Sequence, residues 1–179
     1  MKKLQLGLAV ISLGLASSTV FAAADGTVTI NGKVVDQTCT LGGTNGNYTV
    51  TLPTVGKSTL PTAGTTTGDT KFTINLTSCP TGNIGVYYDN TNANITANGR
   101  LKNTIAGPTG SNVEVQLLNS AKTVIDLTKD RGTQGPLTVA SSGGAVNIDF
   151  YARYYATAAV STATVGDVTT TATYYVVYP

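Results

Sequence analysis

Apolar and polar residues alternate one by one along most of this chain, and no stretch shows the three- and four-residue spacing of an α-helix. Residues 25–35 show the alternation most clearly. Gly26, Val28, Ile30 and Gly32 fall on one side of the segment. The residues on the other side are mostly threonine, asparagine and lysine. Successive side chains of a β-strand point to opposite faces, so a period of two predicts strands that bury one face. The chain is therefore expected to be all-β.

The segment 25–35 places two glycines, Gly26 and Gly32, on the face that its pattern marks as buried. A strand packed within its own sheet rarely gives up two side chains on that face, because glycine has no side chain to pack. Glycine suits a position where another backbone approaches closely. We interpret this segment as a strand that fills a groove on another molecule.

The first 22 residues have the pattern of a secretory signal peptide. Lys2 and Lys3 form a short basic region, and an apolar run from Leu4 to Leu15 follows. That run is shorter than the roughly 20 apolar residues that a membrane-spanning helix needs. Val20 and Ala22 fit positions −3 and −1 of a cleavage site.

The cleavage position can be placed in two ways. Cleavage after Ala22 makes Ala23 the first residue of the mature chain, and this is the position we expect. Cleavage after Ala24, with Ala22 at position −3, is the alternative. Both placements predict an exported protein.

Composition points to an extracellular protein that assembles with others. Without Lys2 and Lys3 the chain carries nine basic and nine acidic side chains, so no nucleic-acid or anionic-membrane partner is expected. Charged residues make up only 11%, whereas threonine, a β-branched residue that suits exposed strand faces, occurs 33 times. Low charge with no net charge favours association over solubility.

The chain has two cysteines, Cys39 and Cys79. An oxidising compartment joins such a pair, so export predicts a disulfide between them. Closing a loop of this length stabilises the fold by about 4 kcal/mol in the chain-entropy model. Two cysteines without any histidine cannot make a four-ligand zinc site, so no metal site is expected.

Residues for catalysis are largely missing. The absence of histidine excludes Ser-His-Asp and Cys-His arrangements. Gly56–Ser58 looks like the end of a phosphate-binding loop, but Thr51 stands where its first glycine is required. Asp126 and Asp130 lie near lysines at a turn, which is typical of solvated surface charge. We expect neither an enzyme, nor a cofactor, nor a small-molecule substrate.

Strand patterns separated by glycine- and asparagine-rich turns continue to the end of the chain, in one domain without internal repeats. Many short strands with one disulfide favour an antiparallel sandwich of immunoglobulin-like type. The run from Pro53 to Asp69 is expected to be a long loop, and Lys122–Leu127 to pair back on the strand before it. The other predicted strands are Tyr48–Leu52, Lys71–Cys79, Asn83–Tyr88, Asn112–Leu118, Leu137–Ala140, Ala145–Tyr155 and Thr169–Tyr178.

Several blocks match the pattern of one family, in order and spacing. They are Gly26-Thr27-Val28 through Gly32-Lys33-Val34-Val35, Cys39, Leu52-Pro53-Thr54-Val55, Phe72-Thr73-Ile74-Asn75-Leu76 ending in Cys79, Phe150-Tyr151-Ala152-Arg153-Tyr154-Tyr155-Ala156, Gly166-Asp167 and Ala172-Thr173-Tyr174-Tyr175-Val176-Val177-Tyr178. The chain resembles a pilin subunit of the chaperone–usher, type 1 fimbrial family. It departs from that pattern at its last residue, Pro179, where a polar residue is more usual.

The resemblance implies an incomplete immunoglobulin-like sandwich that lacks its seventh strand and is completed by a donor strand from another subunit. Residues 1–22 would then be the signal peptide, 23–32 the N-terminal donor-strand extension and 33–179 the pilin domain. Val28 and Ile30 would fill pockets of the groove, and Ala24 its outermost pocket. Gly26 would lie where the groove admits no side chain, and Gly32 near the base of the strand.

The resemblance also implies the partners. A periplasmic chaperone would first lend a strand to the groove beside Tyr174, Val176 and Tyr178, and an outer-membrane usher would export the subunit. Identical or related subunits would then polymerise into a fimbria on the cell surface. A minor adaptor, or a tip subunit that binds a glycan through its tyrosines, is the alternative.

Overall fold

The computed structural model describes residues 27–179 apart from 33, 35–37, 106–108, 136 and 158–163. The chain divides between Val34 and Val35 into two units. All the strands belong to the second unit. The described part contains no α-helix and no helix that is long and apolar enough to cross a membrane.

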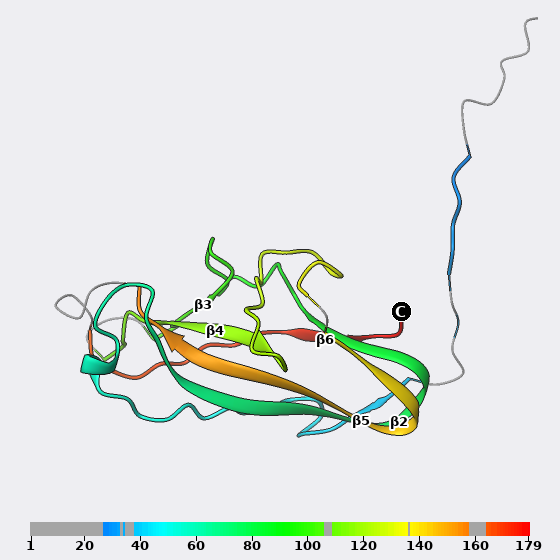
Figure 1. The fold of residues 1–179 in the computed structure, drawn as a ribbon, viewed down its shortest axis with the longest axis horizontal. Helices are drawn as coiled ribbons and strands as arrows, with labels where there is room; N and C mark the ends of the chain where they lie inside the picture. The colour runs from blue at the N-terminus through cyan, green and yellow to red at the C-terminus, as the bar shows by residue number, and fades with distance from the viewer. Residues whose placement is uncertain (1–26, 33, 35–37, 106–108, 136, 158–163) are drawn as a thin grey trace, which may run out of the picture. The chain divides into compact units, whose positions relative to one another are not determined.

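The second unit is built on one six-stranded sheet, and every strand pairs antiparallel with its neighbours. Its order is β1-β2-β5-β4-β3, and β6 pairs with β2 off this path (Figure 1). The elements are β1 (Thr40–Leu41), the 3-10 helix η1 (Lys57–Thr59), β2 (Thr66–Tyr88), β3 (Leu101–Lys102), β4 (Glu114–Asn119), β5 (Thr138–Tyr155) and β6 (Tyr174–Val177).

The strands β2 and β5 are long and pair along nearly their whole length, from Thr66↔Tyr155 to Gly85↔Thr138. The register shifts between Leu76 and Cys79, close to Ser78, whose φ is 52°. Such an irregularity bends a sheet, so the two strands run together through the turn that Figure 1 shows at one end of the fold. The first half of β2 pairs with β1 and its second half with β6, so the one sheet supplies both layers of the sandwich.

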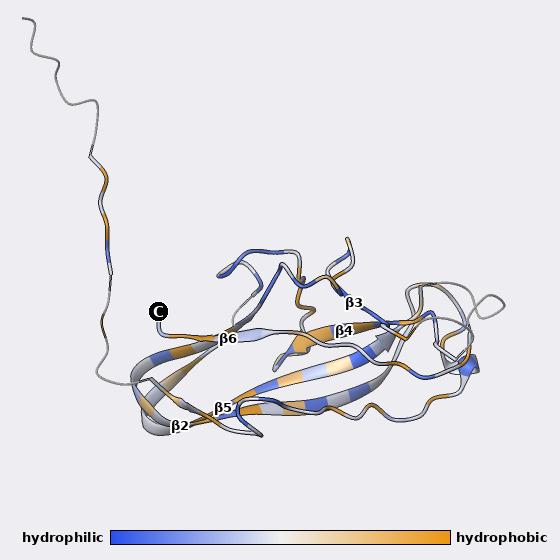
Figure 2. Cartoon of the chain, turned by 180° about the vertical axis from the view of Figure 1, so that it is seen from behind, coloured by the Kyte–Doolittle hydropathy of each residue, from blue (hydrophilic) through white to orange (hydrophobic). Residues whose placement is uncertain are grey.

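The core lies on the faces that the alternation of the two long strands marks as apolar. In β2, Ile74 and Leu76 are buried while Asn75 and Thr77 are exposed. Figure 2 shows hydrophobic and hydrophilic residues alternating along β2 and β5. The buried residues of β5 are Val146, Ile148, Phe150 and Ala152. The all-β prediction is therefore correct.

Several predicted boundaries are wrong. Lys71–Cys79 and Asn83–Tyr88 are parts of the single strand β2, and Leu137–Ala140 largely merges with Ala145–Tyr155 in β5. The expected loop from Pro53 to Asp69 contains η1 and the start of β2. The backbone of Lys122–Leu127 does turn back on β4, but only the bridge Leu118↔Val124 forms.

Tyr48–Leu52 is not a strand, although its side chains alternate between half-buried and exposed. A strand is defined by backbone bonds to a neighbour, and the pairings within the described part of the chain give this segment none. The pattern therefore predicted the direction of the side chains correctly and the pairing wrongly.

Candidate functional site: an unpaired strand edge

The C-terminal strand β6 pairs with β2 on one side only. Their register matches Val86 to Val176 and Tyr88 to Tyr174. The amide of Asp89 donates to the carbonyl oxygen of Thr173, at 2.9 Å, so the backbone groups of odd-numbered residues face β2. Those of Tyr174 and Val176 face the opposite side, where the described residues supply no backbone partner.

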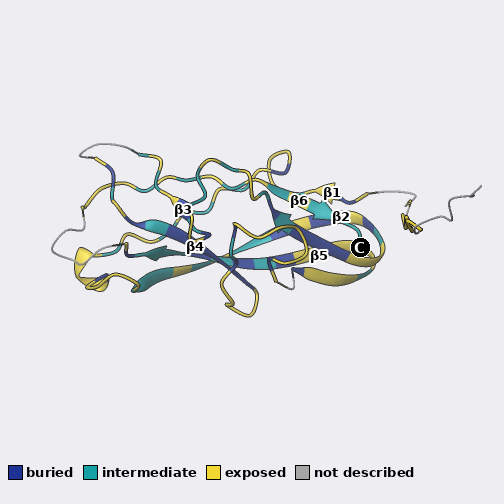
Figure 3. Cartoon of the chain, turned by 90° about the horizontal axis from the view of Figure 1, so that it is seen from above, coloured by how far each residue is buried: buried dark blue, intermediate teal, exposed yellow. Residues whose placement is uncertain are grey.

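The side chains along this C-terminal segment are only partly covered. Ala172, Tyr174, Val176 and Tyr178 are half-buried and pack against the core, whereas Tyr175 is 46% exposed. Figure 3 shows β6 in the intermediate colour rather than the dark blue of the core. One face of the strand therefore contacts the core without being sealed from solvent.

A second extended segment with the same character flanks this edge. Tyr48, Val50 and Leu52 are half-buried and pack against the same core, and Thr49 and Thr51 between them are exposed. The rings of Tyr48 and Tyr174 lie 6.3 Å apart between centroids, so side chains connect the two segments. We call this arrangement the acceptor edge, and it consists of Tyr48, Val50, Leu52, Ala172, Tyr174, Val176 and Tyr178.

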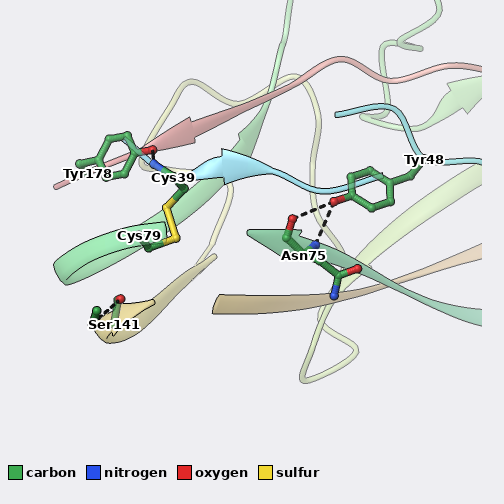
Figure 4. The surroundings of a disulfide bond; sticks show 7 residues. Cys39, Tyr48, Asn75, Cys79, Ser141 and Tyr178 are labelled. Carbon is green, nitrogen blue, oxygen red and sulfur yellow. Dashed lines mark hydrogen bonds between the residues drawn. A yellow bond between two sulfur atoms is a disulfide. The ribbon is translucent and has the colours of Figure 1, made fainter. Parts of the chain in front are cut away.

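Tyrosine hydroxyls occupy backbone hydrogen-bonding positions at the acceptor edge. The amide of Cys39 donates to the hydroxyl oxygen of Tyr178 at 2.7 Å, and the hydroxyl of Tyr174 donates to the carbonyl oxygen of Gly46 at 2.7 Å. The hydroxyl of Tyr48 accepts from the amide of Asn75 at 3.0 Å and lies 2.9 Å from its carbonyl oxygen (Figure 4).

The predicted disulfide is present and fixes the strand beside this edge. Cys39 and Cys79 are bonded, with their Cα atoms 4.1 Å apart, and they lie 40 positions apart in sequence (Figure 4). Both are buried in the core cluster. The bond holds the short strand β1 against β2, where Thr40 pairs with Thr77 and Leu41 with Leu76.

Burial raises the pKa of two tyrosine hydroxyls near the edge. It raises the pKa of Tyr174 above the usual value, and the nearby Tyr48 raises it further. Burial also raises the pKa of Tyr88, with a smaller contribution from Tyr174. The Tyr88 hydroxyl is buried without a hydrogen-bond partner among the described residues.

The N-terminal segment is described from Thr27 onward, and its apolar side chains are uncovered. Val28 is 89% and Ile30 88% exposed, and residues 27–32 form no strand. Gly32 is exposed as well, and a Cβ atom added to it would meet nothing within 4 Å. The positions predicted for cleavage and for the outer donor residues, Ala22, Ala23, Ala24 and Gly26, lie outside the described residues.

The candidate carboxylates have structural partners. The Asp126 carboxylate accepts from the amide and hydroxyl of Thr128, which lower its pKa, and Asp130 accepts from the side-chain amide of Asn90. Within the described ranges, no three histidine, cysteine, aspartate or glutamate side chains gather as metal ligands would.

Comparison with known proteins agrees with this geometry. Residues 52–179 match the family described as FimA, type-1 fimbrial protein A. The chain is 42% identical to the major fimbrial subunit SMF-1 of Stenotrophomonas maltophilia, over 87% of this chain and 94% of that protein. It is 41% identical to the F17 fimbrial protein of Escherichia coli, over 99% of each.

Solved structures show the same fold. The P pilus rod subunit PapA superposes with a TM-score of 0.57 at 17% identity, covering 79% of this chain and 99% of PapA. The type I fimbria protein BPSL1626 of Burkholderia pseudomallei gives 0.55 at 26% identity, covering 80% of this chain and 91% of that one. An all-β chain with an incomplete immunoglobulin-like sandwich is the class that the fold defines. This chain belongs to the type-1 fimbrial protein family, whose members are structural subunits of fimbriae.

Proposed function

We propose that this fimbrial subunit polymerises by donating residues 23–32 to the acceptor edge of the next subunit. The observation that carries the proposal is the free side of β6, where backbone groups without a partner among the described residues lie beside half-buried apolar side chains. An inserted strand would bond to the backbone of Tyr174 and Val176 and cover the side chains. The same strand would give the Tyr48–Leu52 segment the neighbour that it lacks.

The N-terminal segment has the complementary properties. Val28 and Ile30 lie on one face of an extended segment and are almost fully exposed. Burying such side chains contributes roughly 1.5–3 kcal/mol each. Their spacing of two residues matches the alternate positions along the edge, which would fix the register of the inserted strand.

An unfilled edge also requires protection before assembly. Unpaired strand edges with apolar side chains associate with one another unless something covers them. We infer that a periplasmic chaperone lends a strand at Tyr174, Val176 and Tyr178, and that an outer-membrane usher passes the subunit to the growing homopolymer on the cell surface. The oxidising periplasm is also where the Cys39–Cys79 bond would form.

Two single substitutions in the donor segment test the proposal. Ile30→Asp would place a carboxylate without a partner in an apolar site, so fibres should be lost while the subunit still folds with the chaperone. Thr29→Asp adds the same charge on the opposite face and should leave fibres in place. Electron microscopy of cells that express each variant measures the outcome, and fibres of normal number with Ile30→Asp would contradict the proposal.

A further inference from the structure

Three tyrosines of the acceptor edge bond through their hydroxyls to backbone groups. Tyr178 accepts from the amide of Cys39, Tyr174 donates to the carbonyl oxygen of Gly46, and Tyr48 binds the backbone of Asn75. In each contact a side-chain hydroxyl takes the place of a backbone group. The residues of the first two pairs are 139 and 128 positions apart, so the contacts form only in the folded subunit.

The direction of the Cys39 amide shows why this contact competes with a donor strand. The amide of Gly42 donates to the carbonyl oxygen of Asn75, which places the backbone groups of even-numbered residues on the β2 side of β1. The amide of Cys39 therefore faces away from β2, toward the acceptor edge. The Tyr178 hydroxyl occupies it there, at 2.7 Å (Figure 4).

The Tyr174 contact spans the acceptor edge at a second position along the C-terminal segment, four residues before Tyr178. Its hydroxyl reaches Gly46 on the flanking segment, and its ring lies beside Tyr48. A strand laid along β6 would pass between the backbones that this side chain connects. A strand that bonds to the backbone of Tyr174 would therefore lie against this contact.

We propose that Tyr174 and Tyr178 form a latch that holds the empty acceptor edge closed and that an incoming donor strand must release. The latch rests on the proposed strand exchange and adds a step to it. In the closed state the hydroxyls bond to the Cys39 amide and the Gly46 carbonyl. In the filled state the inserted strand covers the two side chains and replaces at least the Tyr178 contact. The latch slows the capture of strands from unrelated chains until a well-matched donor competes for these positions.

The variants Tyr174→Phe and Tyr178→Phe remove one hydroxyl each and keep the ring, so the apolar packing stays. A matched control is Tyr175→Phe, because Tyr175 lies on the outer face of the same strand and its hydroxyl makes no hydrogen bond within the described residues. A fluorescent synthetic peptide of residues 23–33 serves as the probe. Its uptake by the dilute, oxidised full-length chain is followed by fluorescence anisotropy.

Each latch variant should take up the peptide roughly threefold to tenfold faster than the wild type, as expected for the loss of one net hydrogen bond. Tyr175→Phe should match the wild type. Hydrogen exchange of the Cys39 amide gives an independent measurement. Without peptide this amide should exchange faster in Tyr178→Phe than in the wild type, and with peptide the two should be equally protected.

The outcomes separate the latch from strand exchange itself. If the peptide binds every variant at one rate and Cys39 exchange does not respond to Tyr178→Phe, the latch is wrong and donor-strand exchange stands. If the peptide binds neither the wild type nor any variant, the proposed function fails, and the latch fails with it. Faster uptake in the control as well would show a general loosening of β6, which also contradicts the latch.

Discussion

The hydroxyl of Tyr174 lies 2.7 Å from the carbonyl oxygen of Gly46, although the two residues are 128 positions apart in sequence. This bond joins the last strand of the fold to the segment that follows β1, across the side of β6 that has no backbone partner among the described residues. Side chains therefore hold together two parts of the sandwich that no strand pairing among the described residues connects.

Replacing the disulfide should destabilise the subunit strongly. The double variant Cys39→Ser, Cys79→Ser removes the bond that fixes β1 to β2, and the loss of a native disulfide costs roughly 2–5 kcal/mol. Chemical unfolding of the subunit released from its chaperone measures the difference. Wild-type protein should show no alkylatable thiol without reduction, and two free thiols by mass spectrometry would contradict the assignment.

Truncating Tyr178 should weaken capture by the chaperone. The side chain lies at the end of the β6 edge and packs against the core. Tyr178→Ala therefore removes, besides the hydroxyl that Tyr178→Phe also removes, the apolar contact that would hold a bound chaperone strand. We expect less subunit in the periplasm and less that co-purifies with the chaperone. Tyr175→Ala removes a side chain of the same size from the outer face and should have a much smaller effect. Equal co-purification of Tyr178→Ala and wild type would count against this assignment.

Removing the Tyr88 hydroxyl should stabilise the folded subunit. That hydroxyl is buried without a partner among the described residues, while the ring packs edge-on against Phe150 at 5.5 Å. A buried polar group left unsatisfied costs roughly 1–3 kcal/mol, and Tyr88→Phe keeps the ring contact. We expect a higher melting temperature by calorimetry. A variant that melts lower than the wild type would show that the hydroxyl has a stabilising partner.

Stability should fall at alkaline pH. Burial raises the pKa of Tyr88 and Tyr174 in the folded state above the unfolded value of about 10. Their contribution is fully present below that value and is lost as pH rises through the folded-state pKa, because ionisation then favours the unfolded chain. Unfolding curves from about pH 8 to about pH 11 bracket the unfolded pKa and should show the decline in their upper part. Tyr88→Phe should show a shallower decline, and identical slopes would contradict the role of Tyr88.

The sequence pattern predicted side-chain direction better than strand boundaries. The alternation from Val146 to Ala152 placed each side chain correctly, because burial of one face of a strand produces that pattern directly. The joining of two predicted strands into β2 had no such signal. Ser78 and Gly82 lie between the two halves and have positive φ angles, which only glycine adopts readily, so the pattern indicated a break there.

The predicted strand at Tyr48–Leu52 failed for a related reason. Its alternation reflects contact with the core, but strand pairing depends on a neighbour, and the described part of the single chain places none there. The contacts of Tyr174 and Tyr178 were also beyond prediction, since both depend on backbone groups more than a hundred residues away. The sequence did indicate which residues of the C-terminal strand share the face beside the edge.

Residues 23–31 should complete this fold when they lie along β6. Grafting them after Pro179 through a short hairpin linker allows the strand to run back antiparallel to β6. The graft is then intramolecular, with an effective concentration of roughly millimolar, so it should outcompete exchange between subunits. Ile30→Asp and Thr29→Asp within the graft provide a matched pair on its inner and outer faces.

Thermal unfolding of the grafted chain and of these two variants is the decisive experiment. We expect a monomer that forms no fibres, folds without chaperone and melts well above the ungrafted chain. Ile30→Asp should abolish that gain, because it buries a carboxylate without a partner, and Thr29→Asp should retain it. Equal melting temperatures for the graft and its Ile30→Asp variant would mean that this strand does not occupy an apolar site beside β6.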